Sequence, residues 1–320
     1  MKKHLIIWVL MYSALILACR PDDKTSAENT SAGKFTYSGQ KPKITAGDLE
    51  VEFAPELAWT IKWVAYKGAP LITPTGYNGT VINGWIDKDG VTHKWVGTGH
   101  RGEIIKEIVL KVDGKDYPLT RDGETSVPDN FTVQGKMFSL AKKSIIGPYL
   151  CDTLLKFNTD SIDESVNFNL IENEAKISLI YVFMHCFAND TDQWVTEVQG
   201  EILKDCFRND NTNALKKDIR WIGIYSSKTQ SGLVYVYPEI YKGTRKDSNF
   251  IWNRPSDNKL YFDAQIDKKK KDFSFAVSLV FFRSPEKEWL NRAENILSAS
   301  FNIKADLSGN SAANDKEENE

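Results

Sequence analysis

The sequence predicts an all-β fold, a large two-sheet antiparallel sandwich followed by one C-terminal helix. Segment after segment alternates apolar and polar residues, which is the pattern of a strand with one buried face. Turn signals such as Asp113-Gly114 separate these segments. No repeat with a period of roughly 20–50 residues is present, which argues against a propeller or a solenoid.

The first strands show this alternation most clearly. Leu49–Ala54 and Trp59–Tyr66 place apolar side chains at every second position. The Asp87–Gly90 turn separates "TVINGWI" from "VTHKWVG", and Asp113-Gly114 closes the strand 106–114. The remaining strands are expected in "DNFTVQGKMFSLAKK", "SVNFNLIENEAKISLIYVFMH", "WVTEVQGEIL", "DIRWIGIYSS", "SGLVYVYPEIY", "KLYFDAQI" and "KDFSFAVSLVFFR", which gives about fifteen in all.

Two later connections are interpreted as turns between consecutive strands. Glu172-Asn173-Glu174 would join two long strands. The basic cluster Lys268–Lys271 lies between two alternating segments, so it is interpreted as a solvated hairpin tip rather than a binding patch.

One helix is expected near the C-terminus. Ser284 is placed as its N-cap, with Pro285 at the first helical position and Glu286 near the positive helix end. An apolar stripe with helical spacing follows, which would pack on the sandwich: Trp289, Leu290, Ala293, Ile296 and Leu297.

The N-terminus resembles a bacterial lipoprotein signal. Lys2 and Lys3 precede an apolar run, Leu5–Ala18, that ends at Cys19 in a lipobox-like "ILAC". A plain secretory signal with an incidental cysteine is the alternative. The prediction divides the chain into a signal peptide (1–18), lipidated Cys19 with a flexible tether (19–43), a β-sandwich domain (44–304) and a disordered acidic tail (305–320). Acyl chains on Cys19 would anchor the protein to a membrane of the cell envelope.

Composition and motifs exclude several classes of function. The formal net charge is −2 and the basic residues are scattered, so no nucleic-acid partner is expected. No Gly-x-Ser-x-Gly, HExxH, P-loop or dinucleotide motif occurs, and no cofactor is expected. Cys151, Cys186 and Cys206 show no zinc spacing; one disulfide could form among them, leaving at least one thiol.

The stretch "VGTGHRGE" carries the first candidate site. Three glycines surround His100, and a tight bend there would present His100, Arg101 and Glu103 at a strand end. These side chains offer a proton shuttle, a fork of donors and a base or acceptor. The alternative is a glycine-rich loop in which Arg101 and Glu103 form a surface ion pair of little energetic value.

A second group of polar residues follows the strand that ends at His185. This histidine could reach a binding surface or could be a satisfied core residue. Asp190 and Asp192 could suggest calcium, but the loop lacks the acidic density of a calcium site, so no metal is expected. Glu197 is a further candidate acid or base.

Aromatic residues make up 12% of the chain, and some could stack on a ligand while most fill the core. The candidate platforms are Trp85, Trp95, Trp194 and Trp252. Arg254, close to Trp252 in sequence, could border a saccharide groove, although a surface hairpin also explains that stretch.

The chain resembles the galactose-mutarotase-like supersandwich group. The likeness rests on "LEVEFAPELAWTIKWVAYKGAPLITPTGYNG", "GTGHRGE" and "FMHCFANDTDQW". Aldose 1-epimerases carry one histidine in a glycine-containing turn and another at a strand end; here His100 and His185 are 85 positions apart (185 − 100). The resemblance implies a concave carbohydrate-binding face, with a histidine protonating the ring oxygen and a late glutamate as base. Glu239 is the best-placed glutamate, but His100 is followed by Arg-Gly-Glu rather than paired glycines.

Two functions follow as hypotheses. The first is an envelope lipoprotein whose supersandwich binds a saccharide, with epimerase- or lyase-like chemistry at His100 and His185, assisted by Glu103 or Glu197. Arg101, Trp194, Trp252 and Arg254 would then contact the ligand. The second is a non-catalytic structural or binding lipoprotein in which both histidines are incidental; an inhibitor or adhesin is a minor third alternative. The oligomeric state is left open.

Overall fold

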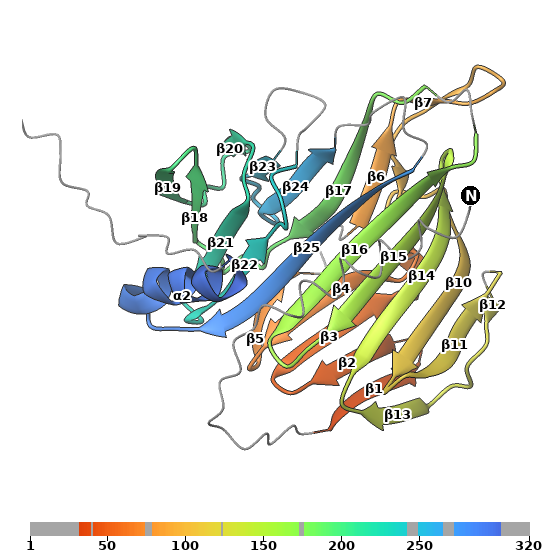
Figure 1. Ribbon diagram of the computed structural model, residues 1–320, viewed down its shortest axis with the longest axis horizontal. Helices are drawn as coiled ribbons and strands as arrows, with labels where there is room; N and C mark the ends of the chain where they lie inside the picture. The colour runs from red at the N-terminus through yellow and green to blue at the C-terminus, as the bar shows by residue number, and fades with distance from the viewer. Residues whose placement is uncertain are drawn as a thin grey trace, which may run out of the picture.

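The computed structural model describes residues 32–301, apart from 40, 74–78, 123, 173–175, 242–248 and 265–271. Within these residues the chain forms twenty-five strands, β1 to β25, and one α-helix, α2. Figure 1 shows the strands arranged in layers, with α2 on one side. The predicted all-β sandwich with one C-terminal helix is therefore confirmed.

Three sheets build the sandwich, and a short two-stranded ribbon is added to them. The N-terminal sheet has the order β13-β1-β2-β3-β4-β5: β1 (Gly33–Ser38), β2 (Lys41–Ala46), β3 (Leu49–Ala54), β4 (Thr60–Tyr66), β5 (Ala69–Ile72) and β13 (Phe131–Gly135). The β17 sheet has the order β20-β23-β24-β17-β6-β9: β6 (Gly79–Asn83), β9 (Val96–Gly97), β17 (Leu179–Cys186), β20 (Asn213–Lys217), β23 (Asn249–Trp252) and β24 (Lys259–Ala264). The ribbon pairs β7 (Trp85–Ile86) with β8 (Thr92–His93).

The long sheet has eleven strands in the order β12-β11-β10-β14-β15-β16-β25-β22-β21-β18-β19. Its strands are β10 (Glu103–Val112), β11 (Lys115–Arg121), β12 (Glu124–Thr125), β14 (Phe138–Ile146), β15 (Tyr149–Phe157), β16 (Ser161–Leu170), β18 (Gln193–Val198), β19 (Glu201–Cys206), β21 (Trp221–Ser226), β22 (Ser231–Val236) and β25 (Asp272–Arg283).

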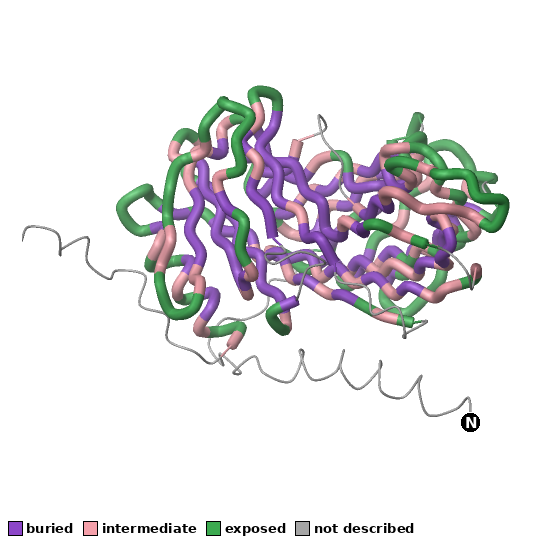
Figure 2. Tube along the Cα trace, turned by 90° about the horizontal axis from the view of Figure 1, so that it is seen from above, coloured by how far each residue is buried: buried purple, intermediate pink, exposed green. Residues whose placement is uncertain are grey.

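Both six-stranded sheets pack on the same face of the long sheet. Phe275 and Phe281 of β25 are six positions apart, so their side chains point to the same face. The ring of Phe275 lies 5.3 Å from that of Phe262 in the β17 sheet, and the ring of Phe281 lies 6.3 Å from that of Tyr66 in the N-terminal sheet. One hydrophobic core therefore joins all three sheets, and Figure 2 shows the buried residues running through the centre.

The helix α2 (Trp289–Phe301) covers part of the opposite face of the long sheet. The Trp289 ring stacks on Tyr225 of β21 at 5.0 Å, and the predicted stripe is buried or packed against this smaller cluster. The predicted N-cap is wrong: a 3₁₀ turn, Glu286–Glu288, precedes α2, and the Ser284 hydroxyl donates to the carbonyl of Pro285 at 3.3 Å. The turn bonds its own backbone, with the Glu288 N–H donating to Pro285, so no hydroxyl cap is required.

Two predicted turns join strands of different sheets. β16 belongs to the long sheet and β17 to another sheet, so the stretch around Glu172 does not close a hairpin, and residues 173–175 lie outside the described part. β24 and β25 are likewise in different sheets, which contradicts the predicted hairpin; Lys268–Lys271 themselves lie outside the described residues. Sequence alternation reports which face of a strand is buried, but it does not report the strand's neighbours.

The predicted tether is too long at its C-terminal end. β1 lies inside the predicted tether 19–43, and β2 begins inside it and ends at Ala46. Phe35 and Tyr37 of β1 are buried. Phe35 and Tyr37 alternate with polar residues along β1, and β1 pairs with β13. The sandwich therefore already begins at Gly33. The signal segment 1–18, Cys19 and the tail 305–320 lie outside the described residues.

Two further sequence expectations concern the cysteines and the membrane. Within the described residues Cys151, Cys186 and Cys206 form no disulfide, and the first two are buried. Among the described helices, none has the length and apolar character needed to span a bilayer.

Candidate functional site

The glycine-rich stretch forms a tight loop between β9 and β10. The Gly97 N–H donates to the Arg101 carbonyl and the His100 N–H donates to the Gly97 carbonyl, both at 2.9 Å. Gly97, Gly99 and Gly102 all have positive φ angles, of 141°, 74° and 80°. A Cβ on Gly97 would lie 2.3 Å from the Thr80 carbonyl oxygen, so glycine is required there for close approach of the backbone. The loop therefore presents different side chains on its two sides.

The inner side of the loop makes a buried ion pair. The Thr98 hydroxyl donates to Glu103 Oε2 at 2.7 Å, and Glu103 Oε1 lies 2.7 Å from the ammonium of Lys142 on β14. The side chains are 2% exposed for Glu103 and 11% for Lys142. Lys142 also donates to the carbonyl of Ala58 at 3.1 Å. The sequence predicts that the loop presents His100, Arg101 and Glu103 together, but Glu103 turns inward and Arg101 outward, so the alternative surface pair of Arg101 and Glu103 does not form either.

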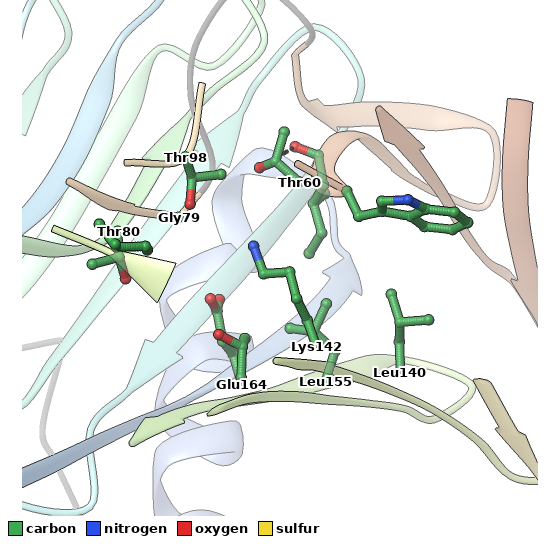
Figure 3. A pocket seen from close by; sticks show the side chains of 12 residues that line it. Thr60, Gly79, Thr80, Thr98, Leu140, Lys142, Leu155 and Glu164 are labelled. Atoms are coloured by element: carbon green, nitrogen blue, oxygen red, sulfur yellow. Dashed lines mark hydrogen bonds between the residues drawn. The ribbon is translucent and has the colours of Figure 1, made fainter. Parts of the chain in front are cut away.

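A second buried pair lies nearby, between β16 and β17. His185 Nε2 is 3.2 Å from Glu164 Oε2, and the His185 side chain is 1% exposed. Thr98, Lys142 and Glu164 line a cavity of about 30 Å³ between the sheets. Figure 3 shows Lys142 reaching from β14 into the space between Glu164 and the threonines Thr60, Thr80 and Thr98. We use the name interior polar network for Lys142, Glu164, Glu103, His185 and the three threonines Thr60, Thr80 and Thr98.

The interior polar network is too confined to hold a sugar. A buried water needs roughly 10–15 Å³ of such volume, so the cavity accommodates about two or three waters. Around it, burial raises the pKa values of the Tyr235 and Tyr237 phenols, and burial followed by the nearby Glu103 charge raises the pKa of the Cys151 thiol. These groups therefore stay protonated, and none is a ready nucleophile.

The outer side of the loop begins a row of aromatic rings across the β17 sheet. The ring of His100 lies 6.2 Å from Trp95, Trp95 lies 5.8 Å from Tyr181, and Tyr181 lies 4.8 Å from Tyr261. Tyr261 in turn stacks on Phe250 at 5.0 Å. We call these five residues the aromatic face. Tyr181 and Tyr261 alternate with core residues of β17 and β24, so the aromatic face lies opposite the side that meets the long sheet.

The aromatic face is partly open to solvent and is bordered by charged groups. Trp95 is 42% exposed, while His100, Tyr181 and Tyr261 are half-buried. Lys259 is on the same face of β24 as Tyr261, and its ammonium lies 3.7 Å from the buried carboxylate of Asp257. Burial, and then the positive charge of Lys259, lowers the pKa of His100 below its ordinary value of 6.5. His100 is therefore a neutral imidazole at pH 7.

Two predicted ligand residues lie beside this face. Trp252 pairs with Lys259 across β23 and β24, so the two side chains share a face of the sheet. The Arg254 guanidinium lies 5.1 Å from the Trp252 ring centroid, and its Nη1 lies 3.7 Å from Asp257. His100, Trp252 and Arg254 thus come from distant parts of the sequence to the surroundings of one buried Lys–Asp pair.

The remaining predicted residues lie elsewhere. His185 faces the long sheet, where it contacts Glu164 and Tyr235, so it points away from the face that carries His100. Trp194 is 4% exposed and belongs to the core. Glu197 of β18 alternates with Trp194 and Thr196 and so points to the α2 side of the long sheet. The catalytic roles of His100, His185, Glu103 and Glu197 stay predictions.

Sequence reasoning missed four residues that matter here: Lys142, Glu164, Tyr181 and Lys259. Lys142 and Glu164 are in phase with the core-facing residues of β14 and β16, a signal that strand alternation offers. Their partners, Glu103 and His185, come from distant parts of the sequence and could not be identified in this way. Tyr181 carries a signal that could have been used, because it is the one tyrosine in a strand that is mainly apolar before His185. The carboxylates considered for calcium are engaged by Lys228 (Asp190) and by Ser227 (Asp192).

Comparison with known proteins gives fold-level likenesses at low identity. No family model matches the sequence, and no curated protein matches it. Similar solved structures include an alpha-mannosidase from Enterococcus faecalis V583, with 10% identity and a TM-score of 0.49. The match covers 81% of this chain and 31% of the mannosidase. An Escherichia coli K12 protein described as an aldose 1-epimerase has 9% identity, a TM-score of 0.40, and coverage of 79% of this chain and 100% of that chain.

A galactose mutarotase-like protein from Lactobacillus casei ATCC 334 has 8% identity, a TM-score of 0.39, and coverage of 76% of this chain and 100% of that chain. The solved structures thus include galactose-mutarotase-like proteins, the group that the sequence resembles. The chain spans about a third of the mannosidase. At these values no residue role or substrate is carried over to the present chain.

Proposed function

We propose that this protein is a lipid-anchored lipoprotein of the cell envelope that binds a saccharide on the aromatic face. The observation that carries the proposal is the Trp95 ring, 42% exposed and held between His100 and Tyr181. A sugar ring offers an apolar C–H face and a rim of hydroxyls, so it suits aromatic side chains that lie beside polar groups. The other possible location, the interior polar network, surrounds only about 30 Å³.

The groups around the aromatic face supply the hydrogen bonds that a saccharide needs. Neutral His100 can donate from one ring nitrogen and accept at the other. Arg254 offers a planar fork of donors beside Trp252, which suits neighbouring hydroxyls or a carboxylate. Binding rather than turnover is the better-supported activity, because His100 and His185 point to opposite sides of the β17 sheet.

The anchor is proposed from the sequence. Cys19 follows the apolar run in a lipobox-like setting, and acylation there would hold the sandwich at a membrane surface. A saccharide-binding sandwich in that position would face the glycans of the envelope.

A glycan array probed with the detergent-solubilised protein tests the binding proposal. We expect a defined subset of saccharides to retain the wild-type protein and to lose it when Trp95 is replaced by alanine. Retention of the same saccharides by the Trp95→Ala variant would move binding to another surface. No retention of any saccharide, with the protein folded, would favour the structural lipoprotein instead.

A further inference from the structure

A groove lies at one end of the sandwich, away from the loop that carries His100. It is formed by β18 and β19 of the long sheet and β20 of the β17 sheet, which lie together in Figure 1, and its volume is about 420 Å³. This volume falls within the range of roughly 300–1,000 Å³ that ligand sites occupy. The groove is therefore large enough for several side chains of a partner.

The wall of the groove contains a buried donor without an acceptor. Trp194 lines the groove and is 4% exposed, and its indole N–H has no hydrogen-bond partner among the described residues. Leu203 and Leu215 add apolar surface on either side. A buried indole N–H normally finds a partner, so this donor is available to a ligand seated in the groove.

The rim of the groove is positively charged on one side. Lys216 and Lys217 of β20 and Lys204 of β19 line it, and none of the three pairs with a carboxylate in the described part of the chain. The acidic residue in the lining, Asp205, is engaged by Arg208 at 2.8 Å. An approaching anionic group therefore meets unneutralised ammonium groups.

Two sheet edges border the groove. β19 is the last strand of the long sheet and β20 the last strand of the β17 sheet, so among the described residues each is paired on one side only. Unpaired backbone groups on an edge strand can accept another strand. β20 carries two lysines, whereas β19 carries Glu201 and Asp205 beside Lys204, so β20 is the edge that suits an acidic strand.

We propose that this groove binds an acidic, extended peptide segment of a partner protein, which adds as a strand along the edge of β20. The backbone of the segment pairs with β20, its carboxylates meet the lysines, and one of its carbonyls accepts from Trp194. Lysines on edge strands also discourage pairing between like chains. That role explains the lysines but not the unpartnered indole or the apolar wall, whereas an acidic occupant accounts for all three.

Fluorescence anisotropy with a labelled seven-residue peptide that alternates glutamate and valine tests this proposal on the full chain. We expect saturable binding that weakens at least tenfold in the Lys216→Glu/Lys217→Glu variant. The matched control is Lys34→Glu, an exposed lysine on β1, which should leave binding unchanged. Equal weakening by both variants would show charge attraction without a site and would overturn the proposal, as would no saturable binding.

Two altered probes test the mode of binding. A peptide with glutamine in place of glutamate and a peptide N-methylated at alternate backbone nitrogens should each bind at least tenfold more weakly. If the N-methylated peptide binds as well as the parent, strand addition is wrong. Trp194→Phe keeps a ring in the core but removes the indole N–H, and we expect binding several-fold weaker than wild type with unchanged circular dichroism.

The occupant can also be distinguished. If the peptide binds only after removal of residues 305–320, the chain's own acidic end is the occupant, and the proposed partner is wrong. Binding that is the same with and without those residues supports a partner. Saccharide retention through Trp95 is measured separately, so failure here leaves the aromatic face untouched.

Discussion

Lys142 carries a positive charge into the interior, where Glu103 neutralises it at 2.7 Å and the Ala58 carbonyl accepts a further hydrogen bond. A buried pair of this kind contributes little net stability over an apolar replacement of both partners. Removal of one partner, however, leaves the other charge buried without compensation. This asymmetry makes the pair a sensitive test of the inward course of the loop.

Replacing Lys142 by methionine should lower the free energy of unfolding by about 3 kcal/mol or more, because Glu103 is then buried unpaired. Urea denaturation measures the change. The neighbouring Lys143→Met is the control: its side chain is 48% exposed and lies 3.8 Å from Asp152, so its loss should change stability by less than about 1 kcal/mol. Glu103→Gln added to Lys142→Met should recover part of the loss. Equal effects of the two lysine variants would contradict the buried pair.

His100 makes stability depend on pH in a defined direction. Its folded pKa is lowered by burial and by Lys259, while in the unfolded chain it is near 6.5. Between these two values the unfolded chain binds more protons, so stability falls as the pH drops through 6.5 and levels off below the folded pKa. The neutral form, which we assign to saccharide binding, therefore prevails at and above pH 6.5.

Comparison of wild type with His100→Gln checks this sign. The wild-type protein should lose more stability than the variant when the pH falls from about 7.5 to about 5.5. An NMR titration of the His100 ring should give a midpoint below 6.5. A midpoint above 6.5 would mean that a carboxylate, rather than burial and Lys259, controls this histidine.

At the scale of elements, the loop 97–103 directs side chains to both sides of the β17 sheet. Thr98 and Glu103 point inward, and His100 stacks on Trp95 outside. The backbone can do this because Gly97 takes a φ of 141° and passes close to Thr80. One short loop therefore connects the interior polar network to the aromatic face.

Gly97→Ala should destabilise the protein by about 3 kcal/mol or more, because strain at this φ adds to a contact of 2.3 Å with the Thr80 carbonyl. Gly90→Ala is the matched control. It also has a positive φ, 78°, but a Cβ there meets no atom within 4 Å, so only the left-handed strain of roughly 1–2 kcal/mol remains. Thermal unfolding of both variants measures the difference, and equal shifts would contradict the close approach.

The elements that could be predicted from sequence are those set by local pattern. Alternation located β3, β4 and β25, and helical spacing located α2. Sheet membership could not be predicted, since β16 and β17 are adjacent in sequence yet join different sheets. The same limit applies to the site. Trp95, Trp252 and Arg254 were identifiable as residue types suited to ligands, whereas the burial of Lys142 depends on a partner brought by another strand.

At the scale of the whole molecule, three regions are distinguished: the proposed N-terminal anchor, the aromatic face and the groove beside β20. The long sheet packs against the other two sheets on one face and against α2 on the opposite face. The strands that carry the aromatic face and those that border the groove therefore share one hydrophobic core. Lys216 lies 5.4 Å from the Phe250 ring, which places the edge of the groove next to the end of the aromatic face.

Replacing Cys19 by alanine should abolish incorporation of labelled palmitate and move the protein from the membrane fraction to the soluble fraction, because the acylated thiol is lost. Cys206→Ala is the control, since Cys206 is an exposed free thiol of the sandwich. It should leave both labelling and fractionation unchanged. Labelling that survives in the Cys19 variant would contradict the anchor.

The most direct test of saccharide binding is the dissociation constant of the best array ligand, measured by isothermal titration calorimetry for two tryptophan variants. Trp95→Ala should weaken binding at least tenfold, about 1.4 kcal/mol, because it removes the exposed ring of the aromatic face. Trp63→Ala removes a half-buried tryptophan that lies beside Lys43 in the N-terminal sheet, and it should bind within twofold of wild type. Wild-type affinity in a folded Trp95→Ala variant would contradict the proposed site.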